Sequence, residues 1–397
     1  MKLMNTHISN SRIESIKNMP ANEVFFYFTY GAWLILLTLY SSYYSVYLTA
    51  VYAPVRYLLL GILLVGEIAN TMQDRKSLPP LIAISLMAFL ALNINGSALF
   101  DALVFVYCAR NIPFEKIARF SLAIILVVFV FILLSMLCGI LPDLIGRYKG
   151  GTRLRHFLGF RYALFPSQIV FNLTCLSLFI NRNDLRLKHI LLLLVVNGVF
   201  FYLTDSRLSF FLAAGLTIAC YGMSRRPYSN FIGRFAAICF IVSTVLGIAF
   251  TVSYNPANSW MSELNSFLNN RLYYANAALR EYGFTIFGTP IDFIGASVKP
   301  NGTQSTLLGK YFYVDCLYVK LGIQYGILFL ALFLVLMTLA SRKAAISKDN
   351  VLCLIMVAIA LHCLIDDLSI QLYYNTFLFL IGSHALTGEI VRKAKKG

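Results

Sequence analysis

Long uncharged runs of apolar residues alternate with short polar segments along almost the whole chain. A helix that crosses a lipid bilayer needs about 20 mostly apolar residues, and most of these runs approach or reach that length. We therefore expect about twelve transmembrane helices, with ten or eleven as alternatives because the fourth run is short and the region 24–69 can be divided differently. The expected helices occupy residues 24–43, 48–69, 79–95, 97–109, 118–140, 161–180, 189–204, 207–223, 235–253, 313–340, 350–366 and 370–388.

The composition of the chain indicates the same class of protein. Hydrophobic residues make up 59% of the 397 residues, charged residues make up 13%, and the mean hydropathy is +0.74. Soluble domains contain roughly 45–50% apolar and about 25% charged residues, so a soluble protein of this length could not cover its surface with so few charges. The eight cysteines form no CxxC pair and support neither a disulfide framework nor a zinc site. We expect an all-α polytopic membrane protein.

The charge of the chain follows from this class. The net charge is +16, from 33 Lys and Arg against 17 Asp and Glu. We expect no nucleic-acid partner, because basic residues collect in the cytoplasmic loops of membrane proteins. A consistent alternation has a cytoplasmic N-terminal segment at 1–23, a single transmembrane domain at 24–388 and a basic cytoplasmic tail at 389–397. The loops 141–160 and 254–312 then lie outside.

These two outer loops are basic for that side of a membrane. The first contains Arg155 and is followed by Arg161, and the second contains Arg271 and Arg280. Long loops are translocated largely regardless of charge, but basic residues at this face also suit a polyanionic ligand at the outer leaflet. Apolar residues recur at helical spacing over 263–282, which predicts a helix on the membrane surface.

Acidic side chains gather at the expected outer ends of several helices. Asp205 precedes the eighth helix, Asp315 lies near the start of the tenth, and Asp366 lies at the end of the eleventh. A carboxylate can orient or deprotonate a hydroxyl, and the planar guanidinium of arginine can give a phosphate two parallel hydrogen bonds. The chain has no Walker-type loop, no dinucleotide-binding glycine motif and no HExxH motif, so we expect chemistry at the membrane face or within the membrane.

Several of these residues also have a structural interpretation. Asp205 could be an ordinary N-cap that satisfies free backbone amides, and Asp366 could anchor a helix end. Arg207 could extend to the outer headgroups. Within the expected helices, Arg56 and Lys320 could extend in the same way or pair inside the bundle.

Several segments carry a family resemblance in their order along the chain: RHFLGFRYALFPSQ, LTDSRLSFF, RLYYANAALREYGFTIFG, VDCLYVKLGIQYGI and HCLIDDLSIQLYYNTFLFLIG. Together they resemble the Wzy-type oligosaccharide repeat-unit polymerases of bacterial capsule, exopolysaccharide and O-antigen pathways, which are relatives of the O-antigen ligases. The resemblance covers roughly residues 20–390. It implies a GT-C-like glycosyltransferase of the bacterial cytoplasmic membrane that needs no metal or cofactor and has both termini in the cytoplasm.

The same resemblance implies partners. The substrates would be undecaprenyl-pyrophosphate-linked oligosaccharides within membrane lipids, and a flippase and a chain-length regulator of the same pathway would be further partners. A hydroxyl of one lipid-linked repeat unit would attack the anomeric carbon of a growing chain, and lipid pyrophosphate would leave. The alternatives are an O-antigen-ligase-like transferase with another acceptor and, in a different class, a lipid-linked oligosaccharide flippase or transporter.

We assign roles to the candidate residues on this hypothesis. The two outer loops must meet over one cavity, where arginines stabilise the leaving pyrophosphate and a carboxylate receives or orients the acceptor hydroxyl. The expected pyrophosphate ligands are Arg271, Arg280, Arg155, Arg207 and Arg161, and the expected catalytic acids are Asp315, Asp205 and Asp366.

Overall fold

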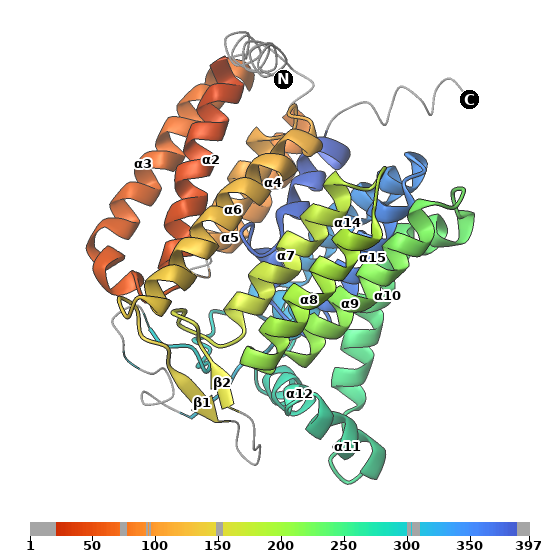
Figure 1. Ribbon diagram of the computed structural model, residues 1–397. Helices are drawn as coiled ribbons and strands as arrows, with labels where there is room; N and C mark the ends of the chain where they lie inside the picture. The colour runs from red at the N-terminus through yellow and green to blue at the C-terminus, as the bar shows by residue number, and fades with distance from the viewer. Residues whose placement is uncertain are drawn as a thin grey trace.

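The computed structural model describes residues 21–71, 78–92, 94, 97–147, 154–299, 303 and 310–386, and most of these residues are helical. The expected basic tail at 389–397 and residues 1–20 of the expected N-terminal segment lie outside the described residues. Figure 1 shows a bundle of long helices with the two short strands at one end. The helices of the bundle are α2 (Ala21–Tyr40), α3 (Ser45–Thr71), α4 (Leu78–Leu92), α5 (Ser97–Cys108), α6 (Phe114–Leu137), α7 (Phe165–Ile180), α8 (Leu187–Thr204), α9 (Arg207–Ser224), α10 (Asn230–Ser253), α14 (Ile327–Ile346) and α15 (Asn350–His362).

Seven helices in the described part of the chain are long and apolar enough to cross a membrane: α2, α3, α6, α8, α9, α10 and α14. The helices α4, α5, α7 and α15 are apolar but shorter. Large apolar side chains face outward from the bundle, for example Val127 and Leu137 of α6 and Val195 and Tyr202 of α8. A soluble protein rarely exposes so much apolar surface, whereas lipid covers such a surface without cost. The fold is that of a helical membrane protein.

The last expected helix, at 370–388, is not one continuous helix as far as the structure describes it. This region contains the short turns η4 (Leu368–Ile370), η5 (Thr376–Leu378) and η6 (Ile381–Leu386). Asn375 accepts a hydrogen bond from the backbone N–H of Phe377, and the side chain of Asn172 accepts one from the backbone N–H of Thr376. Asparagine side chains thus satisfy backbone groups that a regular helix would pair with each other.

The expected helix at 313–340 is interrupted as well. It consists of α13 (Leu317–Lys320), the π-helical η3 (Leu321–Tyr325) and then α14. Gly326 separates the last two with a φ of 92°, and a Cβ at this position would lie only 2.4 Å from the carbonyl oxygen of Ile286. The break therefore needs glycine, both for its left-handed backbone and for the close approach of a distant loop.

One ion pair is sealed inside the N-terminal part of the bundle. Arg56 of α3 donates to both carboxylate oxygens of Asp101 in α5, one of them at 2.8 Å, and Trp33 of α2 donates to the same carboxylate at 3.0 Å. The side chains of Arg56 and Asp101 are 4% and 0% exposed. Together with Trp33, the pair joins α2, α3 and α5. Of the two interpretations of Arg56, pairing inside the bundle is therefore confirmed, and extension to the headgroups is wrong.

The two loops that the sequence singles out lie at the same end of the bundle, the lower end in Figure 1, which we call the loop end. Residues 141–160 contain the antiparallel strands β1 (Ile145–Arg147) and β2 (Leu154–His156). The expected surface helix at 263–282 is two helices, α11 (Ser259–Phe267) and α12 (Arg271–Tyr282).

Two asparagines interrupt that helix. Asn269 and Asn270 have φ values of 57° and 64°, a left-handed conformation that asparagine tolerates better than most residues. Asn265 fixes the turn, because its side chain donates to Asn270 at 3.0 Å and accepts from the backbone N–H of Tyr273 at 3.0 Å. Arg271 consequently begins a new helix, with its own direction, at the edge of the bundle.

Candidate functional site

A cavity of about 820 Å³ opens at the loop end. The first loop contributes Arg155 of β2, and the second contributes the junction of α11 and α12 and the segment around Tyr311. The ends of α7, α9 and α15 complete it. The expected meeting of the two loops over one cavity is therefore confirmed. Its lining residues are Arg155, Tyr162, Leu164, Gln168, Asp205, Ser206, Arg207, Leu208, Ser209, Phe211, Phe267, Leu268, Asn269, Asn270, Arg271, Tyr274, Ala296, Lys310, Tyr311, Asp315, Ile365 and Asp366.

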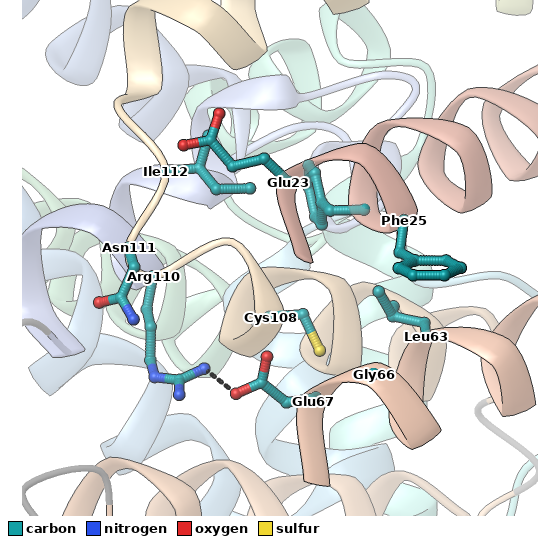
Figure 2. Close-up of a pocket in the computed structure, with 10 residues that line it drawn as sticks. Glu23, Phe25, Leu63, Gly66, Glu67, Cys108, Arg110, Asn111 and Ile112 are labelled. Atoms are coloured by element: carbon teal, nitrogen blue, oxygen red, sulfur yellow. Dashed lines mark ion pairs between the residues drawn. The ribbon is translucent and has the colours of Figure 1, made fainter. Parts of the chain in front are cut away.

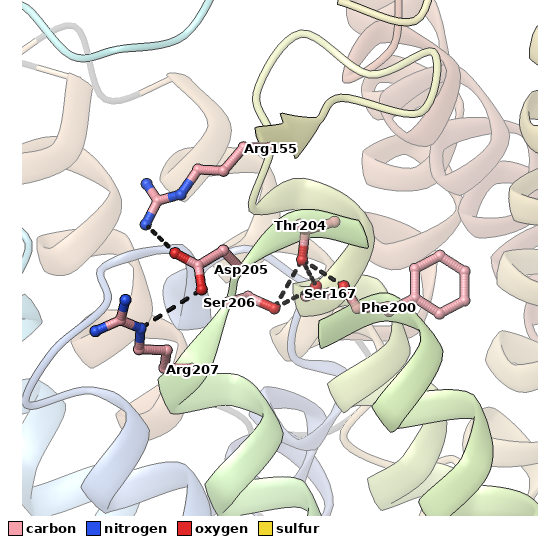
Figure 3. Close-up of polar contacts among 7 residues, drawn as sticks. All are labelled: Arg155, Ser167, Phe200, Thr204, Asp205, Ser206 and Arg207. Atoms are coloured by element: carbon pink, nitrogen blue, oxygen red, sulfur yellow. Dashed lines mark hydrogen bonds and ion pairs between the residues drawn. The ribbon is translucent and has the colours of Figure 1, made fainter. Parts of the chain in front are cut away.

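Asp205 lies between two arginines on one wall of this cavity. Figure 3 shows Arg155 and Arg207 pointing toward its carboxylate from different elements, with N···O distances of 3.3 Å and 3.5 Å. Asp205 follows α8 and has a φ of 52°, so it ends that helix in a left-handed conformation. The N-cap of α9 is Ser206. The interpretation of Asp205 as an ordinary N-cap is wrong, because its carboxylate binds arginines.

Buried hydroxyl groups hold this junction in place. Ser206 donates to Ser167 of α7 at 2.6 Å, and Thr204 lies 2.7 Å from the same hydroxyl. Thr204 also donates to the backbone carbonyl of Phe200 at 2.6 Å (Figure 3). These bonds fix the turn from α8 to α9 against α7, and with it the direction of the Asp205 and Arg207 side chains.

Arg271 lies on a second wall, formed by the start of α12. It donates to the backbone carbonyl of Ile365, and its Nε lies 3.4 Å from Asp315. Burial lowers the pKa of Arg271, but the nearby charges of Asp315 and Asp366 raise it by more, so that its pKa stays above the ordinary value. Arg271 is a permanent cation that is already engaged by protein groups.

Asp366 is buried beside that wall. One oxygen of its carboxylate accepts from the side chain of Gln168 at 2.8 Å, and the other accepts from the backbone N–H of Leu368 at 2.9 Å. The second bond supports the structural interpretation of Asp366, since it satisfies the start of η4. The first bond fixes the carboxylate at the edge of the cavity.

Two of the expected pyrophosphate ligands do not line the cavity. Arg161 donates to the backbone carbonyls of Tyr40 and Val298 at 2.9 Å and 3.1 Å, and so ties the end of α2 to the second loop. Arg280 lies in the last turn of α12 and is exposed. The structure brings together the other six candidates, namely Arg155, Arg207, Arg271, Asp205, Asp315 and Asp366.

The sequence alone did not single out several polar residues of the lining. Gln168 is the clearest case, because it is buried in α7 and contacts Asp366. A buried amide in a helix is a recognisable signal, since burying it without a partner is costly, although Asn172 of the same helix carries this signal too. Tyr162, Tyr274 and Tyr311 also line the cavity, and their sequence context does not distinguish them from the many other tyrosines of the chain.

A smaller cavity of about 230 Å³ lies among α2, α3 and the end of α5. Figure 2 shows its lining, in which Arg110 and Glu67 form an ion pair. Glu23 lines the same cavity and pairs with Lys116 at 3.2 Å. The acids of this cavity are thus paired with cations, and no second arginine faces it among the described residues.

The described residues contain no group of three or more His, Cys, Asp or Glu side chains placed to hold a metal ion. Comparison with protein-family models, with curated proteins and with solved structures finds no match to this chain. The function has therefore to be inferred from the chemistry of the cavity at the loop end.

Proposed function

We propose that the chain is a membrane glycosyltransferase that joins oligosaccharide repeat units carried on a lipid pyrophosphate, like the Wzy-type polymerases that its sequence resembles. The observation that carries this proposal is the cavity at the loop end, where arginines and carboxylates from distant segments face one space. Arginine is suited to phosphate recognition, and carboxylates can act on a hydroxyl. A volume of about 820 Å³ is within the range of sites for small molecules.

The proposal includes a location for the reaction. The loop end faces the outside of a bacterial cytoplasmic membrane, both termini are cytoplasmic, and the broken segments at 313–340 and 370–386 complete a GT-C-like bundle of twelve membrane segments. Irregular backbone is tolerated at membrane depth where it is buried in protein or lines a cavity. The lipid tails of both substrates would lie beside the bundle while their headgroups enter the cavity.

The proposed reaction is a displacement at an anomeric carbon. A hydroxyl of the acceptor repeat unit attacks this carbon, and the bond from the carbon to the pyrophosphate oxygen breaks. The bonding electrons leave with the lipid pyrophosphate, and the hydroxyl proton passes to a carboxylate. The arginines of the cavity stabilise the negative charge that develops on the leaving group, a kind of stabilisation typically worth a factor of about 10²–10³ in rate for one donor.

A purified, reconstituted protein with a synthetic prenyl-pyrophosphate-linked oligosaccharide as both donor and acceptor tests this function. We expect a ladder of products that differ by one repeat unit, together with released prenyl pyrophosphate. Arg155→Ala should reduce the rate about 10²–10³-fold. Arg280→Ala is the matched control, because this arginine is exposed and does not line the cavity, and it should leave the rate unchanged.

Other products would decide against the proposal. Transfer of the oligosaccharide to a different acceptor without a ladder would indicate a ligase-like enzyme. Movement of the intact lipid-linked oligosaccharide across the bilayer, with no new glycosidic bond, would indicate a flippase.

A further inference from the structure

Apart from Lys310, the charged side chains of the cavity form two groups with different balances. Arg155 and Arg207 both contact the carboxylate of Asp205, so the contacts among these three residues set two cations against one anion. We call this group the arginine side. Arg271 faces Asp315 and lies near Asp366, and this group, the acid side, has no net positive charge whether Asp366 carries a proton or not.

The arginine side presents donors to the cavity. The side chain of Arg207 is 54% exposed, and a guanidinium has five N–H donors in a fixed plane. Arg207 is also the first residue of α9, a helix of 18 residues whose first turn lines the cavity. Ser206 directs its hydroxyl to Ser167 and does not cap this turn. The amide of Arg207 donates to the Asp205 carbonyl, and the positive end of the helix dipole adds to the positive character of the wall.

The acid side is occupied by its own contacts. Arg271 is only 16% exposed, and it donates to the Ile365 carbonyl and pairs with Asp315. A phosphate that bound Arg271 would have to displace Asp315 and would approach Asp366, which disfavours the complex by repulsion between like charges. The hydrogen bond from Arg271 to the carbonyl of Ile365 instead fixes the backbone beside Asp366, and the ion pair of Arg271 with Asp315 fixes the carboxylate of Asp315.

We infer that the cavity is divided into a pyrophosphate subsite at Arg155 and Arg207 and an acceptor subsite at Asp315 and Asp366, with Arg271 as a positioning residue for the two acids. This division rests on the proposed function for the identity of the acceptor. It changes the expected role of Arg271, which orients the groups that act on the acceptor hydroxyl and does not bind the leaving group.

Binding of farnesyl pyrophosphate to the purified chain tests the division without turnover. Arg207→Ala should weaken binding about tenfold or more, as expected for the loss of a charged hydrogen bond. Arg271→Ala should change binding less than twofold. Asp315→Asn removes the ion-pair partner of Arg271. If Arg271 were the pyrophosphate ligand, this variant would bind farnesyl pyrophosphate more tightly, whereas with the pyrophosphate at Arg155 and Arg207 we expect unchanged binding.

Turnover gives an independent readout. Arg207→Ala should raise the KM for the lipid-linked donor, whereas Arg271→Ala should lower kcat at unchanged donor KM, and Arg271→Lys should restore part of kcat. Should Arg271→Ala fail to fold, Asp315→Asn and Arg271→Lys carry the comparison.

The outcomes separate the two proposals. Equal weakening of pyrophosphate binding by Arg207→Ala and Arg271→Ala, tighter binding in Asp315→Asn, or no binding to the unmodified chain would overturn the division. A wild-type chain that binds farnesyl pyrophosphate through Arg207 but forms no glycosidic bond would overturn the proposed function and leave the pyrophosphate subsite standing.

Discussion

The Arg56–Asp101 pair and the Arg155–Asp205–Arg207 group are built from the same two residue types, but they differ in what surrounds them. Arg56 and Asp101 are sealed by the bundle, with Trp33 donating to the same carboxylate. In the second group one carboxylate serves two arginines, and Arg207 remains half exposed to a cavity. Burial and stoichiometry, and not residue type, distinguish a charge pair that joins helices from one that can bind an anion.

The largest effect should come from breaking the sealed pair. Asp101→Ala leaves Arg56 as a buried charge without its main partner, which should lower the free energy of unfolding by about 3–5 kcal/mol. We expect a large fall in Tm in detergent and little folded protein in membranes. The double variant Arg56→Met/Asp101→Leu is the matched control and should recover much of the loss, because two apolar residues can replace a buried pair.

A single variant with a Tm close to that of the wild type would show that the pair does not hold the helices together. Burial would then not be what makes an arginine–aspartate pair structural in this protein.

Loss of an acid in the cavity should reduce the reaction rate and leave the folded protein stable. Asp366→Asn keeps the shape of the side chain, and its one amide oxygen can accept from either Gln168 or the backbone N–H of Leu368, but it removes one of the two acids proposed to act on the acceptor hydroxyl. Since general-base catalysis contributes about 10²–10⁴ in rate, we expect a loss of that order with pyrophosphate binding unchanged. Rates of repeat-unit addition measure it, and the exposed Glu281→Gln is the control. An unchanged rate in Asp366→Asn would remove this residue from the mechanism.

The helical membrane fold could be predicted from the sequence because apolar runs and helix length are local properties. Most of the expected helices are present, but the segment at 370–388 is irregular where the structure describes it, since the partner of Thr376 is Asn172, 204 residues away. The Asn269–Asn270 pair was a local signal for the break between α11 and α12, although apolar spacing on both sides favoured one helix.

The candidate site was predictable in residue type and less so in arrangement. The cavity gathers Arg155, Arg207 and Arg271, whereas Arg161 and Arg280 lie elsewhere, and nothing in the basic loops distinguishes these two groups. The spacing of apolar residues predicts which face of a helix is buried, but it does not predict which loop side chains point into a cavity. The pairing of Asp205 with Arg155 joins residues 50 positions apart and depends on the packing of β2 beside α8.

The backbone at Asp205 gives a smaller prediction about the arginine side. Its left-handed conformation is tolerated by asparagine and disfavoured for alanine by roughly 1–2 kcal/mol. Asp205→Asn and Asp205→Ala both remove the charge, so thermal unfolding of the two variants isolates the backbone contribution. We expect the Asn variant to be more stable by about 1 kcal/mol. Equal stability would mean that the turn relaxes in the absence of the carboxylate.

The smallest effect should be at the junction of α11 and α12. Asn265→Ala removes the contacts that fix this turn, and we expect faster hydrogen–deuterium exchange over residues 268–273, equivalent to about 1 kcal/mol of local stability. Asn258→Ala is the control, because the side chain of Asn258 makes no capping bond to α11. Unchanged exchange in Asn265→Ala would show that the rim of the cavity is held by other contacts.

Cryo-electron microscopy of the chain with a bound prenyl-pyrophosphate-linked oligosaccharide tests the central claim most directly. The claim is that the open arginine group at the loop end receives the pyrophosphate. We expect density for the two phosphates beside Arg155 and Arg207 at the start of α9, with the sugars extending toward Asp315 and Asp366. Phosphate density outside this cavity, or at the smaller cavity beside Arg110, would contradict it.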